Sequence, residues 1–261
     1  MIIKLFRLFH LTLVHNPLTR RYQRRFTRLT KRILACPEAY GDLFAIAKIA
    51  KPAAVLDIGA FVGDTVVRFL DELRLPIYCF EPTQRSFEIL SKRFKNEPKV
   101  KLFNCALADR EGEMAFHSNQ NLQTNSLLEN DQGNIQSFPD YTRHVSLSHI
   151  VSMTLDKWAD KYAPDGSLLV KADVQGAEMR LLGGGHRTFK DRVVAFYTEV
   201  QLAAMYKEQA TFDSLHKRLQ ELGFCLLNLY PCGHDSIGRA FQTDGLWVKE
   251  TFLQQHPRLS A

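Results

Sequence analysis

The fourth apolar run of the chain carries a lysine and an acid, residue types that a buried strand seldom holds unless they are paired. Side chains of a strand alternate between its two faces, so Lys171 and Asp173 share one face near the end of this run. Glu178 follows in the first turn of the next expected helix, where its charge suits the helix dipole. The fifth run ends in Glu199, which places another carboxylate at the same edge of a parallel sheet. A positioned carboxylate can take a proton from a hydroxyl, so we expect Asp173 or Glu199 to be a general base and Lys171 to hold the carboxylates in place.

The sequence leaves other interpretations of these charges open. Lys171 paired with Asp173 or Glu199 would also form a purely structural ion-pair network. No metal is expected, although the carboxylates of Asp173, Glu178 and Glu199 could together offer oxygen ligands to a hard cation. Three histidines are rival candidates for the base, namely His149, His186 and His234.

Two earlier runs also end in an acid, and these acids, Asp57 and Glu81, lie 24 residues apart, the length of a strand–helix–strand unit. Asp57 precedes a turn with Gly59 and Gly63, which would let the backbone turn tightly and bring the next helix close to the sheet. This spacing differs from the Gly-x-Gly-x-x-Gly turn that holds a dinucleotide pyrophosphate. An acid before the turn would repel phosphate but can accept a hydrogen bond from an ammonium or a hydroxyl group. Glu81 is placed to accept two ribose hydroxyls, whereas a structural strand–turn–helix is the plainer alternative.

A regular alternation of short apolar runs and helical patterns positions these residues. The expected strands span 53–58, 76–80, 99–107, 167–173 and 192–199, and the expected helices between them span 65–73, 86–94, 154–162 and 176–182. The chain closes with a helix over 211–222 and strands over 224–230 and 245–249. Such alternation predicts a parallel sheet with right-handed crossovers. We therefore expect a Rossmann-like α/β fold with a seven-stranded, mostly parallel sheet and a C-terminal antiparallel hairpin.

The segment around the third strand is less regular. The end of that strand, with Asn104 and Ala106, would flank an adenine ring. Residues 113–117 predict a short added strand, whereas 119–134, rich in Asn and Gln, predict a loop. Loops of such length are usually functional or mobile, and we expect the 109–150 insertion, the 231–244 loop and the N-terminal helices to be the candidate walls of an acceptor pocket.

Positive charge is concentrated at the N-terminus. The chain has a net charge of +6, yet residues 1–34 hold nine lysines and arginines and no acid, so the remainder is slightly acidic. We therefore expect no nucleic-acid binding by the domain itself. The apolar side chains of this segment recur at helical spacing among the cations, a pattern that suits an anionic membrane surface, a helical lid or an acidic ligand.

The predicted organisation is a basic amphipathic helical extension over 1–48, a catalytic domain over 49–252 and a tail over 253–261. No apolar run is long enough to span a bilayer, and the N-terminus lacks the features of a secretory signal. We expect a cytoplasmic protein with peripheral contact at the inner face of the membrane through residues 1–34.

Several segments resemble, in order, the successive motifs of the FkbM family of methyltransferases. They are VLDIGAFVGDT, CFEPTQRSFEIL, ALADREGEMAF, the pair Asn125-Ser126, MTLDKW, LLVKADVQGAEMRLLGG and FYTEV. The resemblance runs over about residues 50–230, and its most specific element is the KxDxxGxE stretch. Phe61 stands where the family usually has Asn, and Ala172 where it usually has Ile.

The resemblance implies a class I methyltransferase fold, S-adenosylmethionine as cofactor, and O-methylation, often of sugar or polyketide hydroxyls. By position it implies cofactor contacts from Asp57, Gly59, Gly63, Glu81 and Ala106. It also places Asp173 and Glu199 near the transferred methyl group.

Together these features predict an S-adenosylmethionine-dependent O-methyltransferase that acts on a hydroxyl of a sugar, a glycan or another secondary-metabolite acceptor. One alternative is a non-catalytic protein that binds S-adenosylmethionine or acts as a scaffold of a glycan-assembly system, which Phe61 and the basic extension favour. Another is a nicotinamide-dependent dehydrogenase or epimerase. That class needs a Gly-x-Gly-x-x-Gly turn and usually a tyrosine–lysine pair, and the sequence shows neither.

Overall fold

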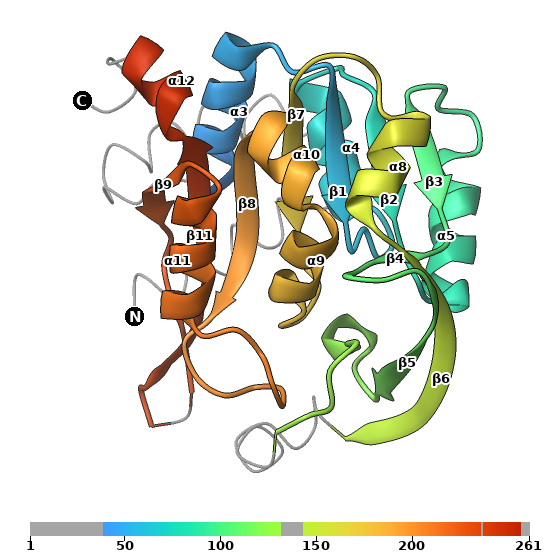
Figure 1. Cartoon of the computed structure of the whole chain (residues 1–261). Helices are drawn as coiled ribbons and strands as arrows, with labels where there is room; N and C mark the ends of the chain where they lie inside the picture. Colours follow the sequence, from blue (N-terminus) through green and yellow to red (C-terminus); the bar gives the residue numbers. More distant parts are fainter. Residues whose placement is uncertain (1–38, 132–142, 236, 257–261) are drawn as a thin grey trace, which may run out of the picture. The chain divides into compact units, whose positions relative to one another are not determined.

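A computed structural model describes three stretches of the chain, residues 39–131, 143–235 and 237–256 (Figure 1). The chain divides into two units, 1–42 and 43–261. Of the first unit only residues 39–42 are described, as the start of helix α3 (Ala39–Ala50). The basic segment 1–34, with its predicted membrane contact, lies outside the described residues. Within the described stretches, no helix has both the length and the apolar character needed to cross a bilayer.

The second unit is built on a mixed sheet whose central strands are parallel. These strands are β1 (Ala54–Ile58), β2 (Ile77–Phe80), β3 (Val100–Phe103), β7 (Leu168–Ala172) and β8 (Val193–Gln201). The antiparallel strands are β9 (Phe224–Leu229), β10 (Gly233–His234) and β11 (Ala240–Lys249). Their order is β10-β11-β8-β7-β1-β2-β3, and β9 and β10 pair one after the other with the same edge of β11. The predicted α/β class with a mostly parallel sheet and a C-terminal antiparallel hairpin is confirmed, with β10 as an additional eighth strand.

The helices lie between the strands, as the alternation of patterns predicts. They are α4 (Asp64–Glu72), α5 (Gln84–Phe94), α8 (Leu155–Tyr162), α9 (Glu178–Gly184), α10 (His186–Asp191), α11 (Phe212–Glu221) and α12 (Glu250–Gln255). Figure 1 shows α9, α10 and α11 across the face of the sheet turned toward the viewer. The side chains of Thr154 and Thr211 cap α8 and α11 by accepting hydrogen bonds from backbone amides three residues on. The core between helices and sheet includes Trp158, Phe189 and Phe196, all fully buried.

The expected strand 99–107 is wrong as a single element. It divides at the turn Asn104-Cys105 into β3, which joins the central sheet, and β4 (Ala106–Leu107), which joins a second sheet in the order β4-β6-β5. β5 (Gly112–Asn119) includes the short strand predicted there, whereas β6 (His144–Met153) is an additional strand. Figure 1 shows β5 and β6 at the lower right, beyond the ends of the parallel strands. The predicted loop contains a short 3-10 helix, η2 (Leu122–Thr124).

Candidate functional site

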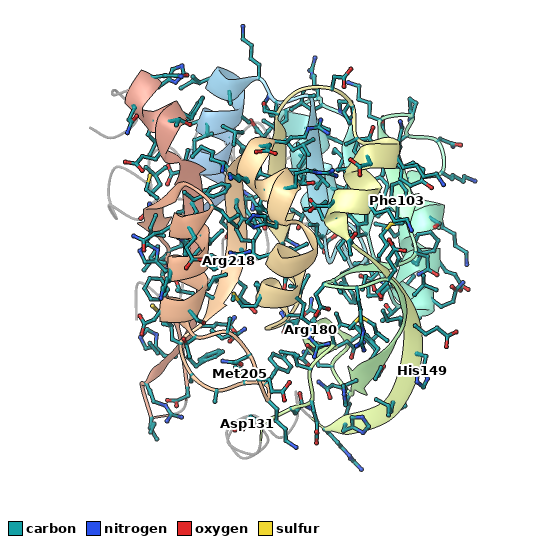
Figure 2. All side chains as sticks on the ribbon, viewed as in Figure 1. Phe103, Asp131, His149, Arg180, Met205 and Arg218 are labelled. Atoms are coloured by element: carbon teal, nitrogen blue, oxygen red, sulfur yellow. The ribbon has the colours of Figure 1, made fainter. Side chains whose placement is uncertain are left out.

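A cavity of about 600 Å³ lies where the parallel strands end. This is the edge at which doubly wound sheets usually bind their ligands. Six of the nine predicted catalytic and cofactor-binding residues line it, namely Gly59, Glu81, Ala106, Lys171, Asp173 and Glu199. Further walls come from β5, η2, the segment 202–209 and the strands β10 and β11. Met205, one of these wall residues, lies at the same end of the domain as β5 and β6 (Figure 2).

Lys171 connects the floor of the cavity to its rim. Its Nζ atom lies 3.1 Å from Asp57 Oδ1 and 3.9 Å from Asp173 Oδ2, and it donates a hydrogen bond to the Gly59 carbonyl at 3.2 Å. Asp57 is fully buried and lies outside the cavity lining, so it does not contact a ligand directly and is joined to the cavity through Lys171. Burial raises the pKa of Asp57, and the positive charge of Lys171 opposes that rise. Lys171 therefore belongs both to a structural ion pair, with Asp57, and to the candidate site, beside Asp173.

Gly59 and Gly63, the two glycines of the turn after β1, have different structural roles. Gly59 has φ +78°, and a Cβ atom there would lie 2.0 Å from the Asp173 carbonyl oxygen, so the turn can approach β7 only as glycine. Gly63 has φ +86° and lies outside the cavity lining, where a Cβ atom would contact Phe94 and Leu90 of α5. Gly63 thus serves the packing of two helices, and the structure gives it no contact with the cavity.

Asn104 is also a brace and not a wall of the cavity. Its Nδ2 donates hydrogen bonds to the carbonyls of Glu81 at 2.9 Å and Pro82 at 3.2 Å. It therefore holds the loop after β2, while Ala106, two residues on, lines the cavity itself.

The Glu81 carboxylate is buried and already holds several protein hydrogen bonds. Oε2 accepts the Phe61 amide at 3.0 Å, and Oε1 accepts the Thr83 amide at 2.9 Å and the Thr83 hydroxyl. A carboxylate offers about four lone-pair positions, so one position on Oε2 stays open for a ligand hydroxyl. To accept hydrogen bonds from two ribose hydroxyls, the Glu81 carboxylate would have to lose its hydrogen bond from the Thr83 hydroxyl. Burial raises the pKa of Glu81, and the hydrogen bonds from Thr83 and Phe61 oppose that rise.

At the opposite side of the cavity, a neutral amide joins the two candidate bases. Gln175 Nε2 donates to Asp173 Oδ1 at 2.7 Å and to Glu199 Oε2 at 3.1 Å. Gln201 Nε2 donates to the same Glu199 oxygen at 2.6 Å. Tyr206 donates its hydroxyl to Gln175 Oε1 at 2.7 Å. Burial, and then the negative charge of Asp173, raise the pKa of Glu199 well above its ordinary value.

The sequence analysis did not single out Gln175, Gln201 or Tyr206. Gln175 lies inside the KxDxxGxE stretch, so its position in the sequence could have indicated a role in the site. Gln201 lies two residues after Glu199 on the same face of β8, which was a weaker one. Tyr206 lies in an irregular segment, and nothing local indicates that it reaches β7.

Glu178 lies behind the cavity, outside its lining. Burial raises its pKa to about 7, the charge of Asp173 adds to the rise, and hydrogen bonds from the amides of Glu178, Gly176 and Val174 oppose it. Across the described stretches, no group of three or more His, Cys, Asp and Glu side chains is placed to hold a metal ion.

The three rival histidines are scattered. His234 lines the cavity, whereas His186 contacts Arg218 at 2.9 Å and His149 lies exposed on β6 (Figure 2). Of the three, only His234 could act in this cavity as described.

The cavity fits a cationic ligand that carries a ribose and an adenine. Glu81 offers an acceptor to a sugar hydroxyl, and Ala106 with Phe80 forms an apolar wall. Asp173 and Glu199 supply carboxyl oxygens at the other end, where positive charge is favoured. S-adenosylmethionine has these features, and Gly59, Glu81 and Ala106 are the residues placed to hold it.

Comparisons with known proteins point in the same direction. The Methyltransferase FkbM domain matches residues 57–226. The 2-O-methyltransferase NoeI of Sinorhizobium fredii is 25% identical over 173 residues, which cover 63% of this chain and 70% of NoeI.

Solved structures of methyltransferases match the chain at low identity. Fibrillarin of Aeropyrum pernix with bound S-adenosyl-L-methionine is 12% identical, with a TM-score of 0.44, over 79% of this chain and 76% of that one. The magnesium protoporphyrin IX methyltransferase of Synechocystis is 10% identical, with a TM-score of 0.44, over 80% and 76% of the two chains.

Proposed function

The chain belongs to the FkbM family of methyltransferases and uses S-adenosylmethionine, and from this premise we propose that it methylates a hydroxyl oxygen of a saccharide or a related small acceptor. The family assignment replaces both the nicotinamide-dependent and the non-catalytic alternatives. The observation that carries the proposal is the pair of carboxyl groups, Asp173 and Glu199, joined by one amide at the wall of the cavity. A hydroxyl needs a base at neutral pH, and this pair offers one. The likeness to a 2-O-methyltransferase supports transfer to oxygen.

Asp173 is the base in this proposal. Its side chain is 43% exposed and lines the cavity, so an acceptor hydroxyl can reach it. Glu199 is less exposed than Asp173, and burial and the charge of Asp173 raise its pKa, so Glu199 holds a proton more tightly than an ordinary glutamate. The two carboxyl groups thus differ in role, because the acceptor can reach the exposed Asp173 more readily than Glu199.

When bound, S-adenosylmethionine supplies a methyl group already activated by its sulfonium. The chain's own residues have to bring the acceptor oxygen into line with that methyl group and remove its proton. Alignment can lower such a barrier by ~7–11 kcal/mol. Proton removal by Asp173 adds ~10²–10⁴-fold in rate. Lys171 places its positive charge 3.9 Å from Asp173 Oδ2 and so helps to hold that side chain in the cavity.

The acceptor part of the cavity supports a saccharide. Its walls carry amide side chains from Asn121, Gln123 and Gln242 beside the aromatic ring of Phe241. Amides can donate to and accept from several hydroxyls, and an aromatic face packs against the C–H face of a sugar ring. A lipid-linked saccharide becomes the favoured acceptor if residues 1–34 attach to anionic lipid.

A panel of saccharide acceptors with isotopically labelled methyl donor tests the proposal, with S-adenosylhomocysteine as the measured product and the position of the methyl group read by mass spectrometry. Asp173→Asn should lower kcat by ~10²–10⁴-fold, because the amide cannot take the proton. Its affinity for S-adenosylmethionine should stay within about threefold, which calorimetry measures. Asp160→Asn, an exposed ion-pair partner of Arg187, is the matched control and should behave as the parent. A methyl group found on nitrogen or carbon, or full turnover by Asp173→Asn, contradicts the proposal.

A further inference from the structure

The side chain of Gln175 lies between the two carboxyl groups of the site. One NH₂ group donates to both Asp173 Oδ1 and Glu199 Oε2, at 2.7 and 3.1 Å. Two carboxyl groups this close would otherwise tend to share a proton directly, as like charges in one site do. A neutral donor between them satisfies one oxygen of each and keeps them apart.

The orientation of this amide is set by Tyr206. The Tyr206 hydroxyl donates to Gln175 Oε1 at 2.7 Å, so the carbonyl end of the amide is occupied and the NH₂ end must face the carboxyl groups. The same hydroxyl lies 3.2 Å from the Thr124 carbonyl. Tyr206 is only 2% exposed, and its ring lies so close to Gly176 that a Cβ atom there would be 2.9 Å from it.

The backbone of Gln175 is also held in an unusual conformation. Its φ is +52°, in the left-handed region that side-chain-bearing residues seldom adopt. Ser126 donates its hydroxyl to the Gln175 carbonyl at 2.7 Å, and that hydroxyl in turn accepts the Leu128 amide at 3.0 Å. Residues held in such conformations tend to cluster at active sites, where the surrounding structure imposes them.

Tyr206 is anchored by the wall of the acceptor pocket. Gln209 Oε1 accepts the amides of Met205 and Tyr206, each at 2.8 Å. The Lys207 amide donates to the Glu129 carbonyl at 2.7 Å, which pairs the segment 202–209 with the segment that follows η2. Two segments far apart in sequence therefore meet at the hydroxyl that orients the amide.

We propose that Gln175, oriented by Tyr206, is a positioning residue that aims Asp173 at the acceptor hydroxyl and keeps its carboxylate apart from that of Glu199. The inference rests on the proposed role of Asp173 as base. Neither Gln175 nor Tyr206 takes the proton. They fix which oxygen of Asp173 is engaged by the protein and leave Oδ2 available to the acceptor.

The fall in kcat toward low pH, which we call the acid limb of the pH–rate profile, is sensitive to the hydrogen bond between Gln175 and Asp173. Turnover falls there because the base becomes protonated. Several ionisable groups interact with Asp173, namely Asp57 of β1, Lys171 of β7, Glu178 of α9, Glu199 of β8, Tyr206, and Asp244 of β11. A substitution at Gln175 replaces none of them, and among them it removes hydrogen bonds only of Glu199 and Tyr206. A shift of the limb on changing Gln175 therefore reflects the lost or altered amide.

Three variants of the full chain test the proposal. Gln175→Asn keeps an amide and tolerates the left-handed backbone, but it is too short to bridge the carboxyl groups. Gln175→Glu keeps the reach and adds a third carboxyl group, and Tyr206→Phe keeps the ring and removes the hydroxyl. Tyr162→Phe, an exposed tyrosine on α8, is the matched control.

Gln175→Asn should lower kcat by ~10- to 100-fold, the effect of losing a hydrogen bond to a charged group, and Tyr206→Phe by about tenfold. Affinity for S-adenosylmethionine, measured by calorimetry, should stay within about threefold, which also shows that each variant is folded. The acid limb should move to higher pH in Gln175→Asn, because a donor to the carboxylate is lost, and further in Gln175→Glu, because a negative charge is added.

Two results overturn the inference. One is kcat within about twofold of the parent in both Gln175→Asn and Tyr206→Phe, while Asp173→Asn remains inactive. The other is a lower kcat with an unmoved acid limb in both Gln175 variants, which indicates a purely structural role. Turnover that survives Asp173→Asn instead removes the proposed base, so the two failures are distinguishable.

Discussion

Replacing Lys171 by methionine should expose how strongly the buried ion pair contributes to the domain. Lys171 Nζ lies 3.1 Å from Asp57 Oδ1, and the two side chains are 6% and 0% exposed. Methionine fills a similar volume but leaves the Asp57 carboxylate buried without its cation. Removing one partner of a buried pair typically costs ~3–5 kcal/mol, a large part of the ~5–15 kcal/mol that holds a domain together. We expect Lys171→Met to lower the free energy of unfolding by about 3–5 kcal/mol.

The pH dependence of this loss has a definite sign. Burial already raises the pKa of Asp57, and without Lys171 it rises further, so the folded state binds a proton more tightly than the unfolded state. A raised pKa contributes stability below the ordinary value of 3.8, and that contribution is lost as the pH rises through the folded value. The deficit of Lys171→Met should therefore be largest at neutral pH and shrink as the pH falls.

Urea unfolding followed by fluorescence from about pH 8 to pH 5 measures the deficit, with the slope of the transition as a check on two-state behaviour. Asp57→Asn combined with Lys171→Met should be more stable than Lys171→Met alone, because no unpaired charge remains. Lys157→Met, which removes an exposed partner of Glu111, is the control and should cost at most about 1 kcal/mol. A loss below about 1 kcal/mol in Lys171→Met, or a deficit that grows toward low pH, would refute the reasoning.

Two further substitutions probe the cofactor end of the cavity. Glu81→Gln should raise the Kd for S-adenosylmethionine by ~10- to 100-fold, because a charge-assisted hydrogen bond to ribose is weakened, and calorimetry against the exposed Glu88→Gln decides it. Equal affinity of both variants contradicts a ribose contact. Gly59→Ala should cost about 2–5 kcal/mol and abolish measurable cofactor binding, because its Cβ atom would lie 2.0 Å from the Asp173 carbonyl. Gly112→Ala, at φ +109° with open space around it, isolates the backbone strain and should cost only ~1–2 kcal/mol, so similar losses in both variants contradict the close-approach argument.

The regular elements were accessible to sequence reasoning because their signals are local. Buried runs with flanking turns indicated β1, β2, β7 and β8 within a few residues of their observed ends. The helix predicted over 211–222 matches α11, whose start is capped by Thr211 and whose end is followed by Gly223, in the left-handed region at φ +80°. The rule that parallel strands end at one edge predicted that Glu81, Asp173 and Glu199 lie at the same edge of the sheet, and all three line the cavity there.

Pairings over long sequence distances were not accessible in the same way. Residues 100–107 look like one strand, yet β3 pairs with β2 of the central sheet and β4 pairs with β6, a strand some forty residues further on. The partner of a strand is chosen by the packing of the whole domain, and no periodicity within the strand encodes it. The same holds for Tyr206, whose contact with Gln175 spans 31 residues.

The sequence by itself determined the family, the parallel sheet and the edge of the sheet at which we propose that the chemistry takes place, because residue type and spacing carry that information. Only the tertiary structure decided which acids face the cavity and which support it from beneath. Asp57 lies below the lining and Asn104 braces a loop, while Gln175 and Tyr206 complete the carboxylate wall. A residue's position along a strand shows which edge it reaches, whereas its exposure depends on the segments that pack over it, and those come from distant parts of the chain.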